Sequence, residues 1–160
     1  LEFAMEKIEK DLKLARGVLL HNDCVLLVQD IRPGQGHYFL PGGNVEPGES
    51  IQAALPREWM EELGWDIRCG AFLGCLEHKW AFTRKQDGAV IEVLEVNFLF
   101  AVEASKETLN QEPLSKEPHL KFSWVPIETI CSMNLMPTPL KNIIPAVAEL
   151  KPTAIWASTI

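Results

Sequence analysis

The stretch that decides the fold is residues 43–65, which read GNVEPGESIQAALPREWMEELGW. It predicts a helix from about Ser50 to Leu63, because Ser50 is a favourable N-cap residue and Gly64 a favourable stop. The apolar residues between these ends recur at helical spacing and form one stripe. They are Ile51, Ala54, Leu55, Trp59 and Leu63. The helix is therefore expected to be amphipathic.

One residue conflicts with this helix. Pro56 lies inside it, where proline removes a backbone hydrogen bond and crowds the preceding turn. The cost is about 3 kcal/mol in an ordinary helix interior. The sequence therefore predicts either a kink at Pro56 or a helix that begins late.

Three glutamates share one face of this helix. Glu58, Glu61 and Glu62 lie at i, i+3 and i+4, where like charges repel each other. Three glutamates alone are more typical of a solvated surface than of a site. Hard cations such as Mg²⁺, however, are bound through carboxylate oxygens, so the cluster is also a candidate metal site.

The surrounding residues favour the metal site. The stretch from Gly43 to Trp65 resembles the Nudix box, G-x5-E-x7-R-E-U-x-E-E-x-G-U, in which U is a bulky apolar residue. Every fixed position of that pattern is present. Similar lead-in residues at 40–50 and a similar late strand at 122–127 extend the resemblance over most of residues 12–132.

The resemblance implies a role for each polar position of the box. The implied metal ligands are Glu58, Glu61, Glu62 and the Gly43 carbonyl, with Glu58 and Glu62 the principal ones. The implied cofactor is Mg²⁺, for which Mn²⁺ can substitute. Glu49 and Arg57 are implied as the pair that orients the helix, since a guanidinium fork can hold a carboxylate. The predicted catalytic residues are Glu61, Glu62 and Arg57.

A general base is expected, but its position varies within the family. The candidates are Glu61 or Glu62 in the box, Glu92 or Glu95 on a later strand, and Glu112 or Glu117 in a loop. The two strand glutamates also fit ordinary alternation of solvent-facing charge. The sequence does not choose among them.

Residues outside the box are the candidates for substrate binding. Aromatic side chains that could stack on a base are Tyr38, Phe39, Trp80 and Phe82, although core packing is the more common role of such residues. Side chains that could hold a phosphate are Arg84, Lys85 and Lys79. Three histidines without obvious partners are interpreted as incidental: His37, His78 and His119.

The remaining pattern predicts an α/β (α+β) fold, which the resemblance narrows to a Nudix-type α/β/α sandwich around a mixed β-sheet. A hairpin is expected from strands 12–20 and 24–29, with later strands at 66–81, 90–102 and 120–125. Residues 105–118 are expected to form a long loop, and 126–133 and 139–150 two further helices. Residues 1–160 are expected to form a single domain, with Leu1 to Ala4 interpreted as a remnant of cloning.

Composition excludes several classes of partner. The net charge of −7 argues against nucleic acid and against an anionic membrane surface, since both need a basic face. The four cysteines lack metal-ligand spacing and predict reduced, mostly buried thiols in a cytoplasmic protein. No signal peptide is recognisable and no apolar run is long enough to cross a bilayer. A monomer or homodimer is expected.

The function implied by the resemblance is Mg²⁺-dependent hydrolysis of the diphosphate linkage in a nucleoside diphosphate joined to another group. The partner is thus a small nucleotide or nucleotide derivative. Nucleoside triphosphates are favoured over ADP-ribose-like compounds and dinucleoside polyphosphates. The main alternative is a catalytically silent module of the same fold that senses a nucleotide, and a more distant one is an isomerase of isoprenoid diphosphates.

Overall fold

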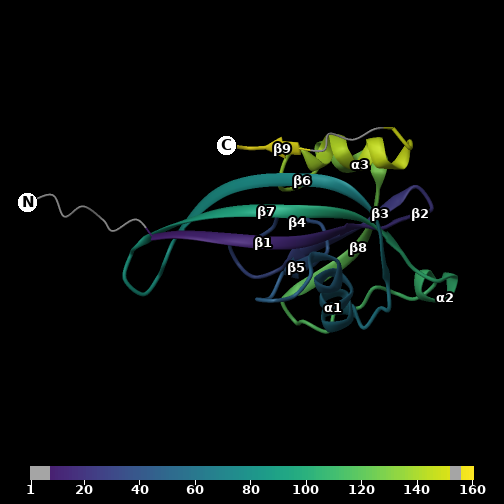
Figure 1. The fold of residues 1–160 in the computed structure, drawn as a ribbon, viewed down its shortest axis with the longest axis horizontal. Coiled ribbons are helices and arrows are strands. Elements are labelled where there is room, and N and C mark those ends of the chain that lie inside the picture. Colours follow the sequence, from purple (N-terminus) through teal and green to yellow (C-terminus); the bar gives the residue numbers. More distant parts are fainter. Residues whose placement is uncertain (1–7, 152–155) are drawn as a thin grey trace, which may run out of the picture.

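The computed structural model describes residues 8–151 and 156–160, so the proposed cloning remnant at Leu1 to Ala4 lies outside the described residues (Figure 1). The elements follow in the order β1 (Ile8–Val18), β2 (Leu20–His21), β3 (Cys24–Asp30), β4 (Tyr38–Phe39), β5 (Gly42–Asn44), α1 (Ile51–Leu63), β6 (Arg68–Thr83), β7 (Val90–Glu103), α2 (Lys106–Leu109), β8 (Leu120–Pro126), the 3-10 helix η1 (Ile127–Ser132), α3 (Leu140–Ala148) and β9 (Trp156–Ser158).

Two sheets form the body of the fold. The larger one has the strand order β5-β1-β7-β6-β9 and is mixed, because β1 runs parallel to β7 and β9 parallel to β6, while β5 pairs antiparallel with β1 and β6 antiparallel with β7. In the smaller sheet, β3 pairs with β2, β4 and β8. Helices α1 and α3 lie on opposite sides of the sheets (Figure 1). The predicted α/β/α arrangement around a mixed sheet is confirmed.

The predicted N-terminal hairpin is wrong in its first strand. Most of that segment is β1, which pairs with β5 and β7 in the larger sheet, and only Leu20 and His21 pair with β3. Asn22 and Asp23 make the tight turn with φ of 49° and 58°, the left-handed region that asparagine and aspartate tolerate. The local turn was predictable, but the pairing of β1 depends on strands far along the chain.

Two other segments differ from the prediction. The loop at 105–118 contains the short helix α2, which begins because the Ser105 hydroxyl accepts a hydrogen bond from the Thr108 backbone N–H at 3.1 Å. The C-terminal strand β9 was not predicted. It pairs parallel with β6 at Cys75, Leu76 and Glu77.

Helix α1 begins where its N-cap predicts. The Ser50 hydroxyl accepts a hydrogen bond from the Ala53 N–H at 3.1 Å, and Gly64 ends the helix with a φ of 70°. The late start that Pro56 suggested is wrong. Pro56 is the sixth residue of α1 and removes a single backbone bond, whereas the same helix fully buries Leu55 and Trp59.

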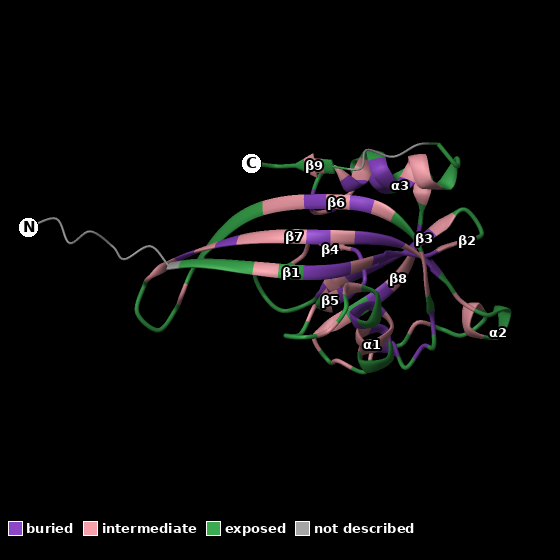
Figure 2. Cartoon of the chain, in the orientation of Figure 1, coloured by how far each residue is buried: buried purple, intermediate pink, exposed green. Residues whose placement is uncertain are grey.

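The core has two parts, one on the α1 side of the sheets and one on the α3 side. Trp59 is the largest fully buried side chain of the described residues and belongs to the first cluster, and Ile144 belongs to the second. The buried parts of β1, β6 and β7 lie between the two helices, whereas the end of β6 toward the β6–β7 hairpin is exposed (Figure 2). This exposed half of the sheet borders the cavity described below.

The cysteines are free, as expected, but they are less buried than predicted. Cys24, Cys69 and Cys75 are half-buried and Cys131 is exposed. Within residues 8–151 and 156–160, no helix is long and apolar enough to span a membrane.

Candidate active site

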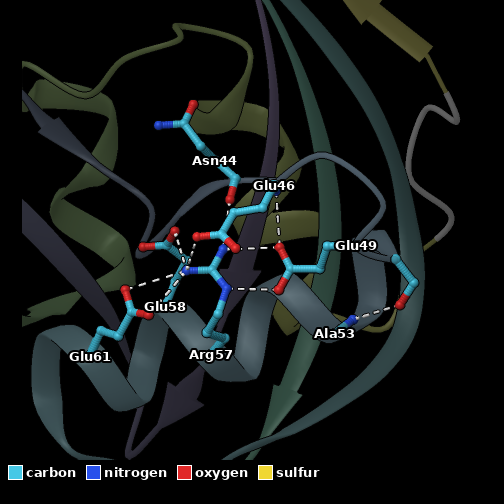
Figure 3. A network of polar contacts seen from close by, with 8 residues as sticks. Asn44, Glu46, Glu49, Ala53, Arg57, Glu58 and Glu61 are labelled. Atoms are coloured by element: carbon cyan, nitrogen blue, oxygen red, sulfur yellow. Dashed lines mark hydrogen bonds and ion pairs between the residues drawn. The ribbon is translucent and has the colours of Figure 1, made fainter.

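Arg57 organises the polar face of α1 (Figure 3). Its Nε and Nη2 atoms donate to the two carboxylate oxygens of Glu49 at 2.7 and 3.0 Å, and Nη2 also donates to the Asn44 carbonyl at 2.9 Å. This two-point contact raises the pKa of Arg57 and lowers the pKa of Glu49. The contact expected between Arg57 and Glu49 is present, and it joins the loop before α1 to the middle of the helix.

The three box glutamates differ in their surroundings. Glu58 and Glu62 are half-buried and Glu61 is exposed. Arg57 Nη1 lies 3.0 Å from Glu58 Oε1 and 3.3 Å from Glu61 Oε1. In the described part of the chain no three acidic, histidine or cysteine side chains converge on one point. Metal ligation by these glutamates therefore stays a prediction.

Burial gives Glu62 an unusual acidity. Desolvation, followed by the neighbouring Glu58 charge, raises the pKa of Glu62 to about 7. Burial also raises the pKa of Glu58. Two half-buried carboxylates that repel each other fit a hard divalent cation, which prefers such oxygen ligands and would neutralise them.

Gly43 lies so close to Glu58 that only a residue without a side chain fits there while Glu58 keeps its place. A Cβ atom at this position would lie 2.4 Å from Glu58 Cδ and 2.5 Å from Glu58 Oε2. Glycine thus allows the β5 backbone to lie directly against the Glu58 carboxylate. The structure thus places one of the predicted carboxylates, Glu58, against the backbone of Gly43.

Arg16 is a site residue that the sequence interpretation missed. Its Nη1 atom donates to the carbonyls of Gly42 at 2.9 Å and Leu40 at 3.2 Å, and its guanidinium lies 5.3 Å from the centre of the Phe39 ring. Burial lowers its pKa, while nearby carboxylates oppose that shift. These carboxylates are Glu95, Glu62 and Glu58. The signal that could have found it is a charged residue within the small and apolar run 14–20.

A cavity of about 670 Å³ extends from Arg16 along the larger sheet. Of the aromatic candidates, Phe39, Trp80 and Phe82 line it, and the Trp80 and Phe82 rings lie 5.5 Å apart. Tyr38 does not line it and packs against the second core cluster instead. A single cavity therefore collects three of the four predicted stacking residues.

The predicted phosphate-binding cations lie away from this cavity. Arg84 is in the β6–β7 hairpin, where its Nε atom donates to Asp87 Oδ1 at 2.9 Å. Lys79 forms an ion pair with Glu92 at 3.2 Å, and the exposed Lys85 belongs to the hairpin turn. None of the three lines the cavity. Strand alternation turns Lys79 away from the face of His78 and Trp80, and Arg84 and Lys85 lie beyond the end of β6, so Arg16 replaces the three as the candidate cation.

Two of the histidines interpreted as incidental line the cavity: His37 and His78. His78 Nδ1 lies 3.0 Å from the Thr159 hydroxyl, and burial lowers the pKa of His78. His119 lies outside the cavity, with Nδ1 4.0 Å from a carboxylate oxygen of Glu117. His78 lines the cavity because side chains two residues apart on a strand lie on the same face, so that β6 presents His78 and Trp80 together.

The general-base candidates separate in space. Glu95 lines the cavity, where one carboxylate oxygen accepts from Trp80 Nε1 at 2.8 Å. Glu92 lies an odd number of residues away and projects from the other face of β7, toward Lys79. Glu117 contributes to the electrostatic surroundings of Glu62, whereas Glu112 is exposed. The charges of Glu58, Glu61 and Glu117 thus all act on Glu62.

Comparison with known proteins gives a family match over most of the chain. The NUDIX domain family model matches residues 11–147. Among relatives, ADP-sugar pyrophosphatase of Mus musculus is 50% identical over 48 residues, which are 29% of this chain and 22% of that protein. A putative 8-oxo-dGTP diphosphatase 2 of Mycobacterium tuberculosis is 43% identical over 53 residues, which are 32% of this chain and 38% of that protein.

A longer alignment covers 77% of this chain and 32% of 8-oxo-dGDP phosphatase of Homo sapiens, at 29% identity. These matches span less than half the length of each relative.

Solved structures support the fold. The mutator MutT protein of Bacillus halodurans has a TM-score of 0.59 at 22% identity, with 92% of this chain and 88% of that chain covered. An ADP-ribose pyrophosphatase of Streptococcus suis has a TM-score of 0.58 at 18% identity, with 92% and 98% covered. At these identities the likeness concerns the fold alone. Together with the family match over residues 11–147, it shows that this chain belongs to the Nudix family.

Proposed function

We propose that this chain is a divalent-metal-dependent hydrolase that cuts the P–O–P link of a nucleoside diphosphate joined to another group. One observation carries the proposal: Arg16 lies between the carboxylates of α1 and the aromatic cavity. A nucleotide needs the same three parts in that order, which are a site for its base, a cation for its phosphates and a metal site at the bond to be cut.

The metal site consists of oxygen ligands from α1 and β5. Glu58, Glu62 and the Gly43 carbonyl would hold a Mg²⁺ ion, with Glu61 a further ligand. Bound there, the ion supplies charge neutralisation and a lower pKa for the attacking water. Arg57 is fixed by its two hydrogen bonds to Glu49. Its role is therefore to hold α1 and the loop after β5 in position.

Arg16 binds the substrate phosphates. Its Nη1 atom is fixed by the Leu40 and Gly42 carbonyls, whereas Nε and Nη2 donate to no residue that the structure describes. Because a guanidinium in a partly dry site interacts strongly with phosphate, these spare donors orient the diphosphate beside Glu58 and Glu62. Phe39, Trp80 and Phe82 then hold the base by stacking.

Nucleoside triphosphates remain the favoured substrates, and the names of the relatives add ADP-sugars and oxidised guanine nucleotides to the panel. The test incubates the protein with each compound and Mg²⁺ or Mn²⁺, and identifies the products by chromatography and phosphate assay. Glu62→Gln is expected to lower kcat/KM on the order of 1,000-fold, because it removes a charged ligand. The control is Glu103→Gln, which changes an exposed glutamate that contacts Arg68 at the end of β7.

Two outcomes would contradict this function. Undiminished turnover by Glu62→Gln would remove the metal-ligand assignment. Tight nucleotide binding without turnover under any divalent ion would favour the sensing module instead.

A further inference from the structure

Two polar side chains lie next to each other on the cavity wall formed by β7. Residues 95, 97 and 99 share one face of the strand, and of these Glu95 and Asn97 are polar. Asn97 is 2% exposed and has one of the two buried polar side chains among the described residues. Buried polar groups are normally fully hydrogen-bonded, so the partners of Asn97 matter.

The hydrogen bonds of Asn97 leave an acceptor unused. Its amide nitrogen donates to the Leu76 carbonyl and to Glu95 Oε2, both at 3.3 Å. Both partners are acceptors, which assigns the nitrogen to that side of the amide. The carbonyl oxygen Oδ1 receives no hydrogen bond from any residue that the structure describes. It is therefore an unsatisfied acceptor in the wall of the cavity.

Glu95 adds further acceptors. Oε1 accepts from Trp80 Nε1 at 2.8 Å, and Oε2 accepts the amide of Asn97. A carboxylate has about four acceptor sites on its two oxygens, so each oxygen can accept another bond. The N–H donors of Asn97 and Trp80 are thus already used within the protein, whereas acceptors of Asn97 and Glu95 remain. A ligand that matches it must present N–H or O–H groups.

We propose that Glu95 and Asn97 select a guanine-type base, building on the hydrolase function proposed above. Guanine alone among the common bases offers two adjacent donors, N1–H and the 2-amino group, which match the two oxygens of a carboxylate. Adenine and cytosine place a ring acceptor beside their amino group, and uracil places carbonyls on both sides of its single N–H. A carboxylate repels those acceptors.

The rings around the pair favour a flat base over a sugar. Trp80 and Phe82 lie beside Glu95 on the same face of the sheet, and Phe39 lines the cavity as well. Stacking on such rings stabilises any base, so it contributes affinity for all of them. Glu95 and Asn97 provide the selectivity for guanine. Sugar hydroxyls are also donors, and the experiment separates them from a base.

The test measures binding without hydrolysis. Calorimetric titration of the full chain with GMP, IMP and AMP compares three purines that differ in their donors. IMP keeps N1–H and lacks the 2-amino group, so GMP is expected to bind about tenfold more tightly than IMP, and AMP more weakly than both. In Glu95→Gln the preference for GMP over IMP is expected to fall below about threefold, since one acceptor becomes a donor.

Matched controls make the ranking specific. Glu103→Gln, on the same strand and outside the cavity, is expected to keep the wild-type ranking. Phe82→Leu is expected to weaken all three ligands similarly, because it removes a stacking ring that has no hydrogen-bond donor for Glu95. The ranking of GMP, IMP and AMP is measured on the wild-type protein, so this part of the test does not depend on whether any variant folds.

Several results would overturn the inference. AMP that binds as tightly as GMP would do so, as would ADP-ribose that binds at least tenfold more tightly than both ADP and GMP. Hydrolysis of all nucleoside triphosphates at equal kcat/KM would leave the proposed function intact and reject guanine selection. Absence of turnover with every nucleotide, together with the GMP ranking, would reject the hydrolase and support the base site.

Discussion

At the scale of single residues, burial and charge give Glu62 and Arg16 properties that their residue types do not have in water. Glu62 is a carboxyl whose pKa is raised to about 7 by burial and by Glu58. Arg16 is a guanidinium whose pKa is lowered by burial. Both groups carry an electrostatic cost in the folded chain, which is typical of residues that serve a bound ligand.

The raised pKa of Glu62 predicts a pH-dependent stability of the metal-free protein. The folded-state pKa of Glu62 lies above the ordinary value of 4.5. Protonated Glu62 therefore makes its full contribution to the free energy of unfolding below pH 4.5, and this contribution is lost as pH rises through about 7. Glu62→Gln, which stays neutral, should therefore be more stable than wild type at pH 8 by about 2 kcal/mol. Urea unfolding in EDTA at pH 4 and pH 8 measures this. Equal differences at both pH values would contradict it.

The position of Arg16 predicts a binding defect. Arg16→Lys keeps the charge and loses the planar fork, so KM should rise about tenfold while kcat changes less than about threefold. Steady-state kinetics at saturating Mg²⁺ measures both constants. Arg68→Lys, at an exposed ion pair with Glu103, is the control and should leave KM unchanged. An unaltered KM in Arg16→Lys would exclude a phosphate contact.

At the scale of elements, the packing of β5 against β1 and α1 depends on two adjacent glycines with different constraints. Gly42 has a φ of 137°, and a Cβ there would lie 2.0 Å from the Ala15 carbonyl oxygen. At Gly43 the three atoms nearest to such a Cβ all belong to the Glu58 carboxylate. Backbone cannot move aside cheaply, whereas the end of a long side chain can.

These two glycines predict opposite mutational effects. Gly42→Ala should lower the free energy of unfolding by about 3 kcal/mol or more, because it strains the backbone of β1 and β5. Gly43→Ala should change stability by less than about 1 kcal/mol but displace Glu58, lowering turnover at least about tenfold. Denaturant unfolding and steady-state kinetics of both variants test this. Normal turnover in a folded Gly43→Ala variant would contradict the placement of Glu58.

At the scale of the whole molecule, the site lies where three remote segments meet. Strand β1 supplies Arg16, the β5–α1 segment supplies the carboxylates, and β7 supplies Glu95 and Asn97. The parallel pairing of β1 with β7 brings the first and third together, with Leu14 opposite Asn97. A ligand that binds this meeting point should stabilise the entire fold.

This arrangement predicts that Mg²⁺ raises the melting temperature. A ligand at ten times its Kd stabilises the folded state by about 1.4 kcal/mol, so a magnesium titration should shift the thermal transition progressively. The double variant Glu58→Gln, Glu62→Gln should show less than a quarter of the shift. Differential scanning fluorimetry in a chelated, salt-matched buffer measures it. The same shift in wild type and double variant would place the ion elsewhere.

Local sequence determined the parts of this protein that depend on neighbouring residues. The caps at Ser50 and Gly64, the helical spacing of the glutamates and the Arg57–Glu49 contact all act over a few residues, so the pattern at 43–65 predicted them. Helical geometry alone places such side chains on one face.

Only the tertiary structure decided the pairing of β1, the addition of β9 and the cavity with Arg16, Glu95 and Asn97. Alternation along a strand predicts which side chains share a face, but not which distant strand lies beside it. Burial then sets the pKa of Glu62 and leaves Asn97 with a free acceptor, and burial exists only once these strands have come together.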